Sequence, residues 1–198
     1  MRLALVSAAL AATLAIVAGL VLTKDGADGA DFRGSEPPDG LALPAFSLRD
    51  DEGRVVRSDE LRDKAVAVTF LDTRCTEACP IIAAQVGQAM RALGDHAGHV
   101  EALAISVDPL RDTPAKVDAF LQRYRAKGAL RYLNGSVSEL RPVWKAFAVA
   151  AAHDTGNPNM HSAPVRIFDR SGRWRSTLHP GVDLTPQSLA HDLRVASG

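Results

Sequence analysis

The sequence has little cysteine and no excess of charge of either sign. Two cysteines among 198 residues exclude a disulfide-rich scaffold and leave one redox pair or one small metal site. Lys plus Arg and Asp plus Glu number 23 each, which argues against a generic nucleic-acid binder, since such proteins depend on excess Lys and Arg. Balanced charge and 46% hydrophobic residues also argue against a disordered chain. The length suits one folded domain.

A long apolar run lies near the N-terminus. Residues 3–22 carry no charged side chain, and about 20 residues at about 1.5 Å rise span a hydrocarbon core of about 30 Å. Arg2 precedes the run, which predicts that the rest of the chain lies outside the cytoplasm, although Lys24 argues mildly against this orientation. The run exceeds the apolar region of about 7 to 15 residues in a typical signal peptide. For residues 1–23 we therefore favour a single-pass signal anchor over a cleaved signal peptide.

The composition changes after this run. Residues 24–40 are rich in Gly, Asp and Pro, which predicts a flexible linker between the membrane and the domain. The folded domain is expected over residues 41–198, beginning near Leu41.

Strand and helix patterns alternate along the domain. Apolar alternation and short β-branched runs predict a hairpin and further strands over 43–57, 65–71, 100–107, 130–133, 164–169 and 173–178. Helical spacing and capping residues predict helices that begin near residues 79, 114, 138 and 186, with a polar loop over 150–162. Alternating strands and helices favour an α/β sheet.

Chemistry-bearing residues follow the two central strands of this predicted sheet. Cys75 follows the strand 65–71, and Asp108 follows the strand 100–107. Functional groups of α/β sheets collect beyond the carboxyl ends of such strands. His161 instead precedes a strand, so its convergence with the others is a hypothesis.

The two cysteines form a C-x-x-x-C pair, Cys75 to Cys79, at the start of a predicted helix. A helix N-terminus stabilises negative charge, so we expect a lowered pKa for the Cys79 thiol. Two thiolates suit Cu(I) or Zn, and a neutral imidazole would complete a trigonal site. A structural disulfide closing so short a loop would restrict little chain entropy, which disfavours that alternative. A redox disulfide and a metal site both remain open.

Six histidines are candidates for the imidazole ligand. His161 is favoured because it stands just before a strand in a loop that can reach the helix N-terminus, and His153 in the same loop is second. Met160 is a soft side chain of lower priority. The other four are His96, His99, His179 and His191.

Three segments together resemble the SCO1/SenC family of copper-delivery proteins. They are VTFLDTRCTEACPI at 68–81, ISVDPLRDTP at 105–114 and HSAPVRIFDRSG from His161. The resemblance covers roughly residues 41–195. It implies a thioredoxin-like fold, here with an N-terminal β-hairpin extension, and a membrane anchor. It also implies a copper site, for Cu(I) or Cu(II), made by Cys75, Cys79 and His161.

Two carboxylates near this site have open roles. The resemblance places Asp108 near the copper. There it would contact the copper ligands rather than the copper itself, or would take part in copper release. The alternative for Asp108 is a turn residue ahead of Pro109. Asp72 departs from the family pattern, and we expect it either to raise the thiol pKa or to stabilise bound copper, with Arg74 offsetting its charge.

The resemblance implies a metallochaperone rather than an enzyme. It would be held at the cell membrane with its domain on the periplasmic side. Its partners would be the copper-receiving subunit of cytochrome c oxidase, for the dinuclear copper centre, and other copper chaperones or thiol reductants.

The alternative function is a thiol–disulfide oxidoreductase that uses Cys75 and Cys79. The C-x-x-x-C spacing differs from the C-x-x-C of thioredoxins, which counts against it. A peroxide-reducing enzyme is disfavoured because no pattern singles out one peroxidatic cysteine. Zinc is disfavoured because the sequence offers no fourth protein ligand.

Overall fold

The computed structural model describes residues 32–159 and 163–198, and Phe32–Gly198 forms one compact unit. The predicted anchor over residues 1–23 lies outside the described residues, and so do Met160 and His161. Among the helices of the described residues, none is long and apolar enough to cross a membrane.

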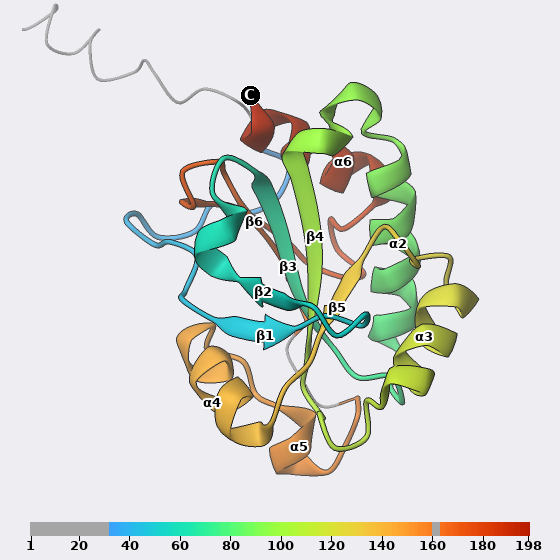
Figure 1. The fold of residues 1–198 in the computed structure, drawn as a ribbon. Coiled ribbons are helices and arrows are strands. Elements are labelled where there is room, and N and C mark those ends of the chain that lie inside the picture. The colour runs from blue at the N-terminus through green and yellow to red at the C-terminus, as the bar shows by residue number, and fades with distance from the viewer. Residues whose placement is uncertain (1–31, 160–162) are drawn as a thin grey trace, which may run out of the picture. The chain divides into compact units, whose positions relative to one another are not determined.

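A mixed sheet of five strands, in the order β5-β4-β3-β6-β7, forms the centre of this unit (Figure 1). The central strands β3 (Ala65–Leu71) and β4 (Val100–Ser106) are parallel, and β5 (Arg131–Leu133) continues parallel to β4. On the other side of β3, β6 (Val165–Phe168) pairs antiparallel with β3, and β7 (Trp174–Leu178) pairs antiparallel with β6. Leu71 pairs with Ser106, so β3 and β4 end side by side.

Both faces of the sheet are covered. One hydrophobic cluster joins the sheet to α2 (Ala78–Arg91), α3 (Pro114–Arg123) and α6 (Pro186–Ser197). The other joins it to α4 (Val137–Ala146) and to the antiparallel hairpin of β1 (Ser47–Arg49) and β2 (Val55–Arg57). Every residue of β3 is buried because successive side chains alternate between these two clusters. This explains why the strand reads as a continuous apolar run.

The element order follows the sequence prediction, with two local differences. The predicted polar loop 150–162 contains a short helix, α5 (Ala152–Thr155), which ends at Gly156 with a φ of 71°. Four residues are too few to give a periodic pattern, so the sequence shows no signal for it. The 3₁₀ turns η1 (Ser58–Leu61) and η2 (Gly94–His99) precede β3 and β4 respectively.

The folded unit begins earlier than the expected Leu41. Ser35 forms a β-bridge with Thr177, and the backbone N–H groups of Arg33 and Gly34 donate to the buried Asp192 carboxylate at 2.8 and 3.1 Å. Asp192 also accepts from Ser176 Oγ at 2.6 Å. These bonds place residues 32–35 in the domain, so the predicted flexible linker 24–40 extends too far along the chain.

Candidate metal centre

The two cysteines lie together where β3 passes into α2. The side chains of Cys75 and Cys79 are 4% and 0% exposed, and both are thiols in the structure. The backbone N–H of Cys79 points at Cys75 Sγ, 3.4 Å away, and the Cys75 N–H donates to the Asp72 carbonyl at 3.1 Å. The loop therefore holds both sulfurs at the first turn of α2, as the spacing predicts.

The prediction of a lowered pKa for Cys79 is wrong. A hydrogen bond between the two thiols raises the pKa of Cys79, and burial raises it further. A helix N-terminus contributes only about 0.3–1 kcal/mol at an ordinary site, which does not offset these effects. Metal binding to thiols releases their protons, so a bound cation would favour the Cys79 thiolate.

An arginine joins the ends of the two central strands. Asp72, which is fully buried, accepts from the Arg74 backbone N–H at 2.7 Å and from Arg74 Nη2 at 3.3 Å. The same Nη2 donates to Asp108 at 2.5 Å. Burial raises the pKa of Asp72, and the charge of Asp72 contributes to the raised pKa of Cys79. Arg74 is thus positioned to offset Asp72, as expected.

Asp108 contributes its backbone to a turn and its carboxylate to an ion pair with the cysteine loop. Its carbonyl accepts from the N–H groups of Arg111 and Asp112 at 3.0 Å each, which forms the turn after β4. Its carboxylate, 6% exposed, pairs with Arg74 in the cysteine loop. Asp108 is therefore linked through Arg74 to the loop that carries Cys75.

Asp112 holds the cysteine loop in place, although no pattern in the sequence singled it out. Asp112 Oδ1 accepts from the N–H and the hydroxyl of Thr73 at 2.9 and 2.7 Å. Its Oδ2 accepts from Ser106 at 2.6 Å and from Tyr132 at 2.7 Å. Burial raises the pKa of Tyr132 well above its usual value, so this hydroxyl stays protonated and donates. The ISVDPLRDTP segment contains Asp112, but only the fold shows its contacts.

We expect Asp112→Asn to weaken copper binding about tenfold, the effect of losing a residue that orients a ligand loop. The amide nitrogen cannot accept the bonds that one carboxylate oxygen accepts, so the free energy of unfolding should also fall by about 2–3 kcal/mol. A competition titration and a urea denaturation measure the two effects.

Asp192→Asn is the matched control, because Asp192 is an equally buried aspartate that binds the N-terminal segment instead. It should lose comparable stability and keep its copper affinity. Equal copper affinity in both variants would contradict the positioning role of Asp112.

The third predicted ligand, His161, lies outside the described residues, and Asn159 before it in the chain bonds to the cysteine loop. Asn159 accepts from the Thr76 N–H at 3.1 Å and donates to Glu77 at 3.2 Å. On the other side, Ala163 packs in the hydrophobic cluster that contains Cys75 and Cys79. Within residues 32–159 and 163–198, no group of three or more His, Cys, Asp or Glu side chains is arranged to hold a metal ion.

The remaining histidines make contacts of other kinds. His153, the second candidate, lies in α5 and lines a pocket with Arg74 and Asp108. His96 contacts Ser197, His191 contacts Asp192, His179 lies 3.9 Å from Asp183, and His99 ends η2.

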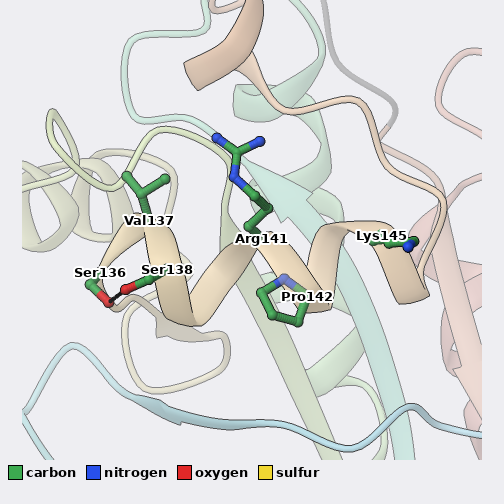
Figure 2. Close-up of a pocket in the computed structure, with 6 residues that line it drawn as sticks. All are labelled: Ser136, Val137, Ser138, Arg141, Pro142 and Lys145. Carbon is green, nitrogen blue, oxygen red and sulfur yellow. Dashed lines mark hydrogen bonds between the residues drawn. The ribbon is translucent and has the colours of Figure 1, made fainter.

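A separate hollow of about 860 Å³ lies along α4 and does not resemble a metal site. Figure 2 shows the side chains that line it, with the Ser136 and Ser138 hydroxyls 2.9 Å apart. None of the six described residues around it carries a thiol or an imidazole: Ser136, Val137, Ser138, Arg141, Pro142 and Lys145.

A central α/β sheet with two thiols at the helix that follows its middle strand defines a thioredoxin-like thiol protein. The SCO1/SenC family model matches residues 35–197, and the chain belongs to this family. Both expectations, the family and the thioredoxin-like sheet, are confirmed.

Three related proteins show how similar the chain is to known members of this family. The ScoI of Bradyrhizobium japonicum, solved with copper bound, is 30% identical at a TM-score of 0.67, over 79% of this chain and 99% of that chain. An SCO2-like protein of Rickettsia conorii is 27% identical over 155 residues, which are 75% of this chain and 74% of the relative.

The third protein shares the fold. BsSco is a member of the Sco family of cytochrome c oxidase assembly proteins in which a disulfide switch has been identified. It is 23% identical at a TM-score of 0.67, over 82% of this chain and 97% of that chain. Copper in the related ScoI agrees with the cofactor expected from the sequence.

Proposed function

We propose that this protein is an extracytoplasmic copper metallochaperone that delivers copper to the dinuclear centre of cytochrome c oxidase. The observation that carries the proposal is the buried thiol pair of Cys75 and Cys79 at the start of α2. The copper-bound ScoI relative supports it. The uncharged run over residues 3–22, preceded by Arg2, supports a membrane tether with the domain on the periplasmic side.

The proposed ligands are the thiolates of Cys75 and Cys79 and the imidazole of His161. Two thiolates favour Cu(I), and the addition of an imidazole lets the same site hold Cu(II). The bond of Asn159 to Thr76 in the cysteine loop, and the place of Ala163 in the hydrophobic cluster that contains both cysteines, support His161 over the other histidines. Copper is the cargo of this protein. A three-ligand site leaves one coordination position of the copper open, and a ligand of the acceptor protein can bind there.

The second candidate function is thiol–disulfide exchange with a partner. Two cysteines close enough for one to hydrogen-bond the other favour it, and so does the disulfide switch of BsSco. In that reaction a partner disulfide accepts two electrons and two protons while the two thiols join as a disulfide. The burial of Cys79 argues against it as the attacking group, and the copper bound to the ScoI relative favours copper binding. We therefore rank copper binding first.

A copper titration of the compact unit Phe32–Gly198 tests the proposal. The reduced protein is titrated with Cu(I) without oxygen, against a competing chelator. We expect one tightly bound copper per chain. Weak binding, or copper taken up without a fixed stoichiometry, would contradict the proposal and favour the oxidoreductase. The reduction potential of the cysteine pair would then be measured.

A further inference from the structure

A pocket of about 440 Å³ opens beside the cysteine loop and is rich in positive charge. Its walls include Arg74, Arg111 and Lys116, together with Asp108 and Leu110. These residues come from the loops that follow β3 and β4 and from the first turn of α3. Figure 1 shows α3 and α5 at the end of the sheet where β3 and β4 finish.

Two of the three cations face solvent. Arg74 is held between Asp72 and Asp108, so its charge is largely balanced inside the protein. The Arg111 side chain is 63% exposed and only loosely paired, with Nε 3.8 Å from Asp108. Lys116 is exposed and forms no ion pair within the part of the chain that the structure describes. The rim of the pocket therefore carries net positive charge.

Leu110, between these charges, is 70% exposed. A large apolar side chain within a charged rim is the usual arrangement of a protein-binding surface, where the apolar centre is buried and the rim pairs with opposite charge. A small free anion would pair with the cations but would leave Leu110 in water. The patch therefore fits a protein better than a phosphate.

From this arrangement we propose that Leu110, Arg111 and Lys116 form the docking surface for a carboxylate-rich face of the protein that receives copper. The inference rests on the proposed function and adds the chemistry of the partner. Arg74 connects the surface to the thiol pair, because it stands next to Cys75 in the chain and lines the pocket. A partner bound there would lie beside the copper, as direct ligand exchange requires.

Copper transfer kinetics test this surface. The copper-loaded unit Phe32–Gly198 is mixed with the soluble copper-accepting domain of an oxidase subunit that has net negative charge, at ionic strengths of about 20 and about 200 mM. We expect the second-order rate constant to fall about tenfold at the higher salt, as for electrostatically steered encounters. Lys116→Glu should lower the low-salt rate about five- to tenfold and flatten its salt dependence. Leu110→Ser should lower the rate at both ionic strengths.

Arg62→Glu is the matched control, since Arg62 is an exposed cation just before β3 and therefore at the opposite end of the strand. It should transfer copper at the wild-type rate. No copper bound by the wild-type protein in the titration would overturn the proposed function. Copper that binds but does not transfer would overturn the delivery function. Transfer that is independent of salt, or equal effects of Lys116→Glu and Arg62→Glu, would overturn the docking surface alone.

Discussion

Cys79→Ser should abolish tight copper binding, with an affinity loss of at least about a thousandfold, or about 4 kcal/mol. Cys79 supplies one of the two proposed thiolates, and a serine hydroxyl stays protonated and is a poor ligand for Cu(I). The affinity is measured by anaerobic competition with a Cu(I) chelator, alongside the thermal midpoint of each variant.

Ala89→Ser provides the control for a hydroxyl buried in the same helix. Ala89 is 0% exposed on the same buried face of α2, and the substitution leaves both thiols in place. It should lose stability, because its hydroxyl is buried, and keep wild-type affinity. A Cys79→Ser protein that binds copper within tenfold of wild type would contradict the ligand assignment.

His161→Ala should lower copper affinity about a hundredfold and largely spare thiol–disulfide exchange. The imidazole completes the proposed three-ligand site, whereas exchange needs only the two sulfurs. Copper affinity by competition and the rate of exchange with a small disulfide are measured on the same protein. The two readouts separate the metallochaperone from the oxidoreductase.

His153→Ala is the matched control because both histidines belong to the segment predicted as one loop, 150–162. We expect it to keep wild-type copper affinity. A larger loss in His153→Ala than in His161→Ala would move the third ligand to His153. Unaltered affinity in His161→Ala would contradict the three-ligand site.

The central sheet could be predicted because its strands carry their own signal. The continuous apolar runs at 65–71 and 100–107 correspond to β3 and β4, which are buried on both faces. The short helix α5, whose His153 N–H donates to the Val107 carbonyl, and the bonds of Arg33 and Gly34 to Asp192 could not be predicted, since both depend on contacts between distant parts of the chain.

The site shows the same division between local and tertiary signals. The spacing of Cys75 and Cys79 at a helix start is local, so their proximity could be predicted. The pKa of Cys79 depends on burial and on the partner sulfur, and local reasoning gave the wrong direction. The role of Asp112 depends on Thr73 and Tyr132, which come from other segments of the chain.

X-ray absorption spectroscopy of the copper-loaded protein reports which atoms bind the copper. We expect a spectrum with two sulfur ligands and one imidazole nitrogen, and the loss of the imidazole contribution in His161→Ala. A wild-type site with fewer than two sulfurs, or an imidazole signal that persists in His161→Ala, would contradict binding by Cys75, Cys79 and His161.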